Sequence, residues 1–155
     1  MDDRLIHGQV VVAWGQRLRP ARIWVVDDAA AADAWEREAL AMSAPGIEVH
    51  VVTVAAAATA FASEGAAPGG AFLLVRGLRA ALALAEAGAP VTAYTIGGLH
   101  YAPGKTKLNE YVYLDDEDRR AARSLLARGI QLLAQDVPGT RPLPLVEIEP
   151  ALGGV

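Results

Sequence analysis

The sequence predicts one doubly wound α/β domain, in which helices cover both faces of an open, mostly parallel sheet. Short apolar runs alternate along the chain with helical stretches of about ten to fifteen residues. A helix that joins two strands in this way makes a right-handed crossover and leaves the strands parallel. The chain has 155 residues, the length of one domain, with 53% apolar and 21% charged residues, a globular composition.

The first half of the chain predicts an opening helix and three strand–helix pairs. Residues 8–18 fit a helix, although the run of valines at 10–12 would also suit a strand. Asp27 or Asp28 is a plausible N-cap for the second helix, and Pro45-Gly46 would end it. The expected strands are 23–26, 47–52 and 71–75, and the helices that follow them are 29–43, 54–64 and 78–87.

The second half continues this alternation as far as residue 134. Strands are expected at 91–96, 111–114 and 130–134, with a helix at 115–128. This helix has acidic residues in its first turn and arginines later, which complements the helix dipole. Prolines at 138, 142, 144 and 150 break any long element, so 139–155 should be a loose tail or hold an edge strand at 146–148.

Charge and cysteine content exclude several functional classes. The net charge of -4 and pI of about 5.3 leave no basic field for nucleic acid or an anionic membrane. The absence of cysteine excludes disulfides, thiolate catalysis and cysteine-ligated metals. The start lacks the order of a signal peptide, and the longest nearly apolar run, 49–62, is shorter than the roughly 20 residues of a membrane span. We therefore expect a cytoplasmic protein.

Two segments approach known ligand motifs without matching them. Residues 98–106 resemble a Walker A loop, but Leu99 stands where that loop needs glycine, and a strand-like stretch follows instead of a helix. The acidic run 115–118 is interpreted as helix capping and not as a metal site. We expect neither a bound nucleotide or other cofactor nor a metal ion.

Among the three histidines, His7 is the candidate for chemistry. His50 alternates with valines and is interpreted as a strand residue, whereas His100 lies in a loop and is either functional or an ordinary surface histidine. His7 directly precedes Gly8, which opens the first helix. Backbone N–H groups at a helix start attract anions, and neutral imidazole is a nucleophile near pH 7.

The neighbours of His7 favour a phosphoryl acceptor over a structural histidine. Arg4 is a permanent cation whose guanidinium can fork onto phosphate oxygens. Gly8 has no side chain to obstruct a bulky partner. Asp3 is placed to orient Arg4 or to hydrogen-bond the imidazole of His7. No metal is required by this chemistry.

The segment Asp2-Asp-Arg-Leu-Ile-His-Gly-Gln-Val10, with Trp14, resembles the phosphorylation loop of a known family. These are the IIB subunits of the mannose/fructose/sorbose family of bacterial phosphotransferase systems. The resemblance extends over roughly residues 1–140 and implies the same open, mostly parallel sheet. Its further motifs are Arg22-Ile-Trp-Val-Val-Asp-Asp28, Ile96-Gly-Gly-Leu-His100, Gly104-Lys-Thr106, Val112-Tyr-Leu-Asp-Asp-Glu-Asp118, Leu126-Ala-Arg-Gly-Ile-Gln-Leu132 and Val137-Pro138.

The resemblance implies a role for each residue of the loop. His7 would take a phosphoryl group from a phosphorylated IIA partner and pass it to a sugar held by the membrane subunits IIC and IID. Arg4 would hold the phosphoryl group, while Asp3, Gly8 and Gln9 would bind phosphate or support the loop. The protein would associate with the membrane through these permease subunits, and a homodimer is a candidate assembly.

Two alternatives remain open at this point. One is a regulatory IIB-like phosphoacceptor that serves no permease, and the other is an inactive, binding-only remnant of the family. Family members also carry a short apolar strand ahead of the loop, near the middle of the sheet. Because this sequence starts at Met1, within the motif, that strand is expected to be missing from a single domain over 1–155, with unpaired edges beside it.

Overall fold

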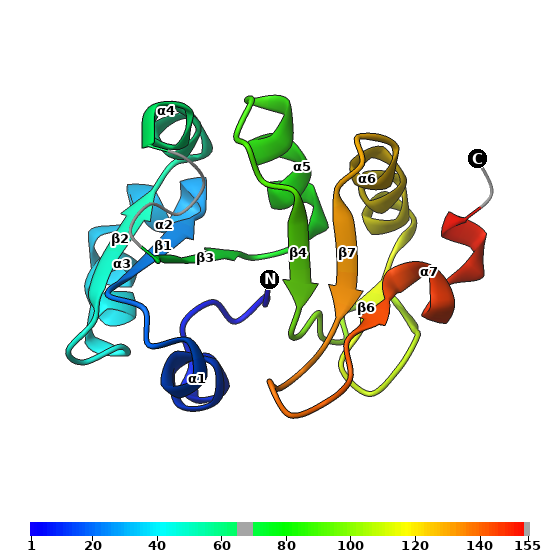
Figure 1. Ribbon diagram of the computed structural model, residues 1–155, viewed down its shortest axis with the longest axis horizontal. Coiled ribbons are helices and arrows are strands. Elements are labelled where there is room, and N and C mark those ends of the chain that lie inside the picture. The colour runs from blue at the N-terminus through cyan, green and yellow to red at the C-terminus, as the bar shows by residue number, and fades with distance from the viewer. Residues whose placement is uncertain (65–69, 154–155) are drawn as a thin grey trace.

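Two three-stranded sheets stand side by side in the computed structural model, which describes residues 1–64 and 70–153 (Figure 1). One sheet has the order β2-β1-β3 and the other β4-β7-β8. Within these two sheets all pairs are parallel except β7–β8, as the prediction of a mostly parallel sheet requires. The strands are β1 (Arg22–Val26), β2 (Glu48–Val52), β3 (Phe72–Val75), β4 (Ala93–Ile96), β7 (Gln131–Ala134) and β8 (Leu143–Pro144). A separate antiparallel pair joins β5 (Thr106–Lys107) to β6 (Tyr113–Leu114).

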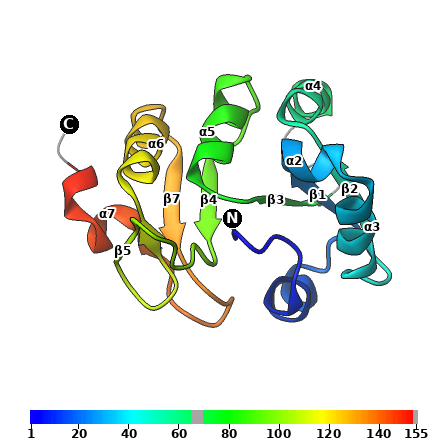
Figure 2. The same cartoon turned by 180° about the vertical axis from the view of Figure 1, so that it is seen from behind.

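The helices flank these sheets, with α4, α5 and α6 in a row along one side and α1 on the opposite side (Figures 1 and 2). The predicted first helix is present, but most of it is π-helical. The helices are η1 (Gln9–Gly15), α1 (Gln16–Leu18), α2 (Asp28–Ala32), α3 (Ala34–Met42), α4 (Val54–Glu64), α5 (Leu78–Glu86), α6 (Asp116–Ala127), α7 (Leu145–Ile148) and η2 (Pro150–Leu152). No helix in the described ranges combines the length and apolar character needed to cross a bilayer.

Two buried apolar clusters hold the elements together. The larger cluster contains the buried faces of α4, α5 and α6, including Phe61, Leu84 and Leu125. The smaller one lies against β1 and contains Leu5 and Ile6, the two residues directly before His7. The segment that leads to His7 is therefore fixed by burial of its own apolar side chains.

Two predictions about local structure are wrong. The single helix expected at 29–43 is broken at Asp33, which is extended and accepts hydrogen bonds from the N–H groups of Trp35 and Glu36. This carboxylate caps α3 and so stabilises the break. The edge strand expected at 146–148 is helical, and the segment is not loose because Leu145 and Leu152 are buried in the larger cluster.

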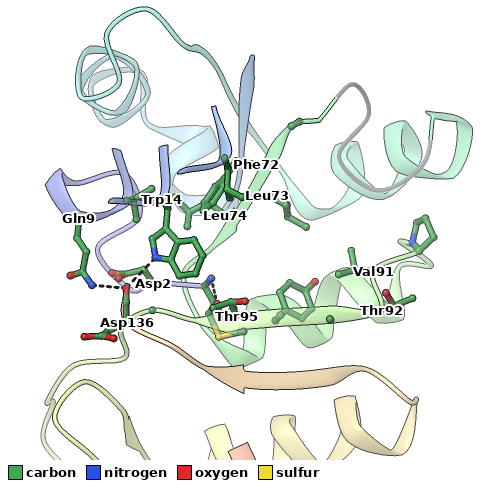
Figure 3. A pocket seen from close by; sticks show the side chains of 18 residues that line it. Asp2, Gln9, Trp14, Phe72, Leu73, Leu74, Val91, Thr92, Thr95 and Asp136 are labelled. Atoms are coloured by element: carbon green, nitrogen blue, oxygen red, sulfur yellow. Dashed lines mark hydrogen bonds between the residues drawn. The ribbon is translucent and has the colours of Figure 1, made fainter. Parts of the chain in front are cut away.

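Residues 1–3 join the two sheets between β3 and β4. The amino group of Met1 donates to the Thr95 carbonyl at 2.7 Å, and Gly97 N–H donates to the Met1 carbonyl at 2.8 Å. On the other side, Asp2 N–H donates to the Val75 carbonyl at 3.1 Å. Strands β3 and β4 do not pair with each other in the described residues. A cleft of about 360 Å³ lies between them, and Trp14 is one of the residues that line it (Figure 3).

Candidate functional site

The chain turns just before His7 at Leu5, whose backbone is left-handed with a φ of 55°. This conformation is unusual for a residue with a branched side chain and has to be held by its surroundings. Leu5 is buried, and its N–H donates to the Asp2 carbonyl at 3.1 Å. The turn is thus fixed by packing and hydrogen bonding, and it delivers His7 to the start of η1.

The His7 ring is held against the loop backbone. Its Nδ1 lies 2.9 Å from the Leu5 carbonyl, which can only accept a hydrogen bond, so Nδ1 carries the proton in this arrangement. Nε2 then keeps the lone pair, is buried, and has no hydrogen-bond partner in residues 1–64 and 70–153. Because the side chain is only 19% exposed, a phosphoryl group can reach a ring nitrogen only if the ring turns or releases Leu5.

Asp2 anchors Arg4 beside this ring. The Asp2 carboxylate accepts hydrogen bonds from the Arg4 backbone N–H at 3.0 Å, from Nε at 3.2 Å and from Nη2 at 3.3 Å. Asp2 is only 2% exposed, and its Oδ2 lies 3.7 Å from His7 Nε2. The Arg4 side chain is 44% exposed and also donates to Gln9 Oε1 at 3.4 Å. Sequence reasoning missed Asp2 because two adjacent aspartates gave no sign of which one turns inward.

Asp3 does not orient Arg4 or contact the His7 ring, contrary to the prediction. Its carboxylate instead accepts two hydrogen bonds from His100, one from the backbone N–H at 2.6 Å and one from Nδ1 at 2.7 Å. The two aspartates therefore make different contacts. Asp2 accepts hydrogen bonds from Arg4, whereas Asp3 accepts hydrogen bonds from His100 and so fixes the loop that follows β4. His100, which the sequence left open, therefore contacts the loop that carries His7.

Gly8 and Gln9 lie as expected at the start of η1, and no side chain caps this helix end. A Cβ on Gly8 would have no heavy atom within 4 Å, which leaves open space for an approaching group. Gln9 Nε2 and Trp14 Nε1 both donate to the Asp136 carbonyl, at 2.7 and 3.1 Å (Figure 3). These bonds tie η1 to the segment after β7.

A second cavity, of about 330 Å³, lies beside Asp3 and is lined by paired charges. Arg76 donates to Asp27 Oδ2 at 2.8 Å and to Glu36 Oε1 at 2.9 Å. Burial tends to raise the pKa of Asp27, but hydrogen bonds from Arg76 and Ala30 outweigh this and hold that pKa below its usual range. The network connects the ends of β1 and β3 under the loop that carries the site.

The other segments considered from the sequence lie as predicted. His50 is in β2, where it stacks on Trp24 and contacts Glu48. Residues Thr106–Lys107 form β5 instead of opening a helix, so the resemblance to a Walker A loop ends there. Asp115 caps α6 in a capping box with Asp118, which accounts for the acidic run.

Comparison with known proteins identifies relatives along nearly the whole chain. Residues 1–150 match the family described as "PTS system sorbose subfamily IIB component". The mannose-specific EIIAB component of Escherichia coli K12 is 35% identical over 149 residues, which are 96% of this chain but 46% of that protein. The chain thus spans about half the length of that relative. The N-acetylgalactosamine-specific IIB component 1 of the same strain is 31% identical, over 90% of this chain and 89% of that one.

A solved structure shows the same arrangement. The crystal structure of the IIBSor domain of the sorbose permease from Klebsiella pneumoniae superposes with a TM-score of 0.87 at 28% identity. The match covers 97% of this chain and 93% of that one.

Proposed function

The chain belongs to the sorbose subfamily of phosphotransferase-system IIB components, and we propose that it is a phosphoryl carrier that accepts phosphate on His7. The observation that carries the proposal is the position of the imidazole at an uncapped helix start, beside the pair that buried Asp2 forms with exposed Arg4. A nucleophile, an exposed cation and open space over Gly8 are what a transient phosphohistidine requires.

Transfer between two phosphohistidines breaks one P–N bond and forms another, so the step is close to thermoneutral. The protein therefore has to supply position and charge compensation for an in-line displacement. Arg4 suits this role because its guanidinium is half exposed, and Asp2 accepts hydrogen bonds only from its Nε and Nη2. As negative charge develops beside His7, Nη1 is left to donate to phosphoryl oxygens while the buried Asp2 carboxylate stays paired.

The proposed donor is a phosphorylated IIA protein, and the acceptor is a sugar held by the membrane subunits IIC and IID. The E. coli mannose-specific relative is named an EIIAB component, which supports a IIA-type donor. The carrier would then work in the cytoplasm and meet the membrane through these subunits. A homodimer is compatible with this scheme and is not required by it.

Residue-resolved mapping of phosphate tests the proposal. The protein is incubated with a phosphorylated mannose-type IIA domain, and the label is located by mass spectrometry. We expect one acid-labile, alkali-stable phosphate on His7 and none in His7→Ala, whereas His50→Ala is labelled like the wild type. A wild type that stays unlabelled would favour the binding-only remnant. Labelling without sugar phosphorylation in membranes containing IIC and IID would favour the regulatory alternative.

A further inference from the structure

Two histidine rings lie close to the carboxylate of Asp2. His7 Nε2 lies 3.7 Å from Asp2 Oδ2. A ring nitrogen of His100, an oxygen of Asp2 and an oxygen of Asp3 all lie within 4.8 Å of one another. A Cβ on Gly98 would come within 2.7 Å of the His100 ring and 2.8 Å of Asp2 Oδ2, so the ring and the carboxylate are closely packed there.

Asp3 sets the tautomer of His100. A carboxylate oxygen accepts hydrogen bonds, so the 2.7 Å contact from Asp3 Oδ1 places the ring proton on Nδ1. Nε2 then carries the lone pair, and it has no hydrogen-bond partner in the described part of the chain. The His100 side chain is 42% exposed, in contrast to the enclosed Nε2 of His7. An aspartate that orients an imidazole in this way is the arrangement of a general base.

We propose that His100 is the general base for the second transfer, from phospho-His7 to a hydroxyl acceptor, with Asp3 as its positioning residue. This inference rests on the proposed function of His7 and adds a residue that acts only when the acceptor is a hydroxyl. In the step, the acceptor oxygen forms an O–P bond as the N–P bond breaks, and the electron pair of that bond returns to the His7 ring. The hydroxyl proton moves to His100 Nε2, and the resulting imidazolium is stabilised by Asp3.

The two transfers differ in their need for this base. An incoming phosphohistidine leaves its phosphoryl group on the imidazole of His7, and no hydroxyl proton has to be removed. A hydroxyl acceptor has to lose its proton as the O–P bond forms, and a base placed near the phosphoryl group assists that loss. His100 should therefore affect release of the phosphoryl group and not its acceptance.

Water is the simplest hydroxyl acceptor, so the lifetime of phospho-His7 tests the proposal on the protein alone. The wild type, His100→Ala, Asp3→Asn and the control His50→Gln are phosphorylated with phosphoramidate. Phosphate on His7 is then followed by residue-resolved mass spectrometry, both as it appears and as it hydrolyses after the donor is removed. In Asp3→Asn the side-chain amide donates toward Nδ1, which moves the ring proton to Nε2 and removes the base without removing the ring.

We expect hydrolysis of phospho-His7 to slow by about 10-fold or more in His100→Ala and Asp3→Asn, with labelling rates unchanged. His50→Gln, which alters a histidine–carboxylate pair on β2, should hydrolyse like the wild type. Equal hydrolysis rates in all four proteins, or a parallel loss of labelling and hydrolysis, would overturn the role of His100. A wild type whose His7 takes no phosphate from either phosphoramidate or phospho-IIA would overturn the proposed function as well.

Discussion

Asp2 holds Arg4 through both carboxylate oxygens, with Nε 3.2 Å from Oδ1 and Nη2 3.3 Å from Oδ2. Because Asp2 is buried, its carboxylate would be an unpaired charge without Arg4, which would be costly. The cation that the proposed chemistry uses is thus positioned by hydrogen bonds to a carboxylate of the same loop.

Arg4→Ala should slow phosphoryl transfer from phospho-IIA to His7 by roughly 10- to 100-fold, because one cationic donor to the developing charge is lost. Slow labelling of His7 should persist, since the nucleophile remains. Arg4→Lys should fall between the wild type and Arg4→Ala, because an ammonium keeps the charge but not the fork. The measurement is the initial labelling rate of His7, with the exposed Arg17→Ala as control. A wild-type rate in Arg4→Ala would remove Arg4 from the site.

Gly98→Ala should displace the side chains of His100 and Asp2. A Cβ at this position would meet the His100 ring at 2.7 Å and Asp2 Oδ2 at 2.8 Å, distances that real Cβ atoms do not show. We expect a loss of about 1–3 kcal/mol in the free energy of unfolding, as for other overpacked positions, and slower labelling of His7. Gly97→Ala is the matched control, because within the described residues its Cβ would meet no heavy atom closer than 3.6 Å. Urea unfolding of both variants checks the difference, and equal stability would contradict the close packing.

Much of this architecture is encoded in local patterns, and the errors have identifiable causes. The alternation of apolar runs with helices predicted the parallel strands because crossover handedness is a general constraint. The break at Asp33 was missed because the alanines on both sides favour one continuous helix. The hydrogen bonds by which the Asp33 carboxylate caps α3 stabilise the break instead. Residues 146–148 alternate like a strand, yet a single helical turn places Leu145 in the larger cluster just as well.

The site itself could be predicted only in part. His7, Arg4 and Gly8 are close in sequence, so their chemistry was visible from local order. The roles of Asp2 and Asp3 depend instead on Val75, at the end of β3, and on Gly98, after β4, whose carbonyls accept hydrogen bonds from the N–H groups of residues 2 and 3. His100 joins the site through a contact across 97 positions in the chain. Long-range pairing of this kind leaves no periodic signal in the sequence.

Arg76→Met should destabilise the protein in a pH-dependent way. Burial raises the pKa of Asp27, but the hydrogen bonds from Arg76 and Ala30 and the charge of Arg76 together outweigh it and hold the pKa below its ordinary value of 3.8. A carboxyl with a lowered pKa contributes stability that is present above about pH 4 and is lost as the pH falls through the folded-state value. The variant should lose about 1–3 kcal/mol at pH 7, and its unfolding free energy should approach that of the wild type below pH 3.

Urea unfolding between pH 3 and pH 7 measures this convergence. Arg120→Met is the control, because Arg120 makes only an exposed contact with Glu117 at 3.8 Å within the same helix. A difference between Arg76→Met and the wild type that stays constant with pH would show that packing, and not the charge on Asp27, accounts for the loss.

The amino group of Met1 gives a prediction about the cleft between β3 and β4. Burial lowers its pKa from 8.0 to about 6, because the ammonium is removed from water. The unfolded chain therefore binds more protons between pH 6 and pH 8, and the free energy of unfolding should rise with pH across this window. A shift of this size corresponds to about 2–3 kcal/mol. Thermal unfolding of the 155-residue chain at pH 5.5 and pH 8.5 measures the effect.

Extending the chain ahead of Met1 should remove this pH dependence and fill the cleft. An added segment converts the ammonium to an amide, whose N–H can still donate to Thr95. Five alternating apolar and β-branched residues should in addition pair with the facing edges of β3 and β4 and raise the melting temperature by several degrees. An extension of equal length made of glycine and proline also removes the charge but cannot form a ladder. The difference between the two extended proteins therefore measures strand pairing alone, and equal melting temperatures would show that the cleft does not accept a strand.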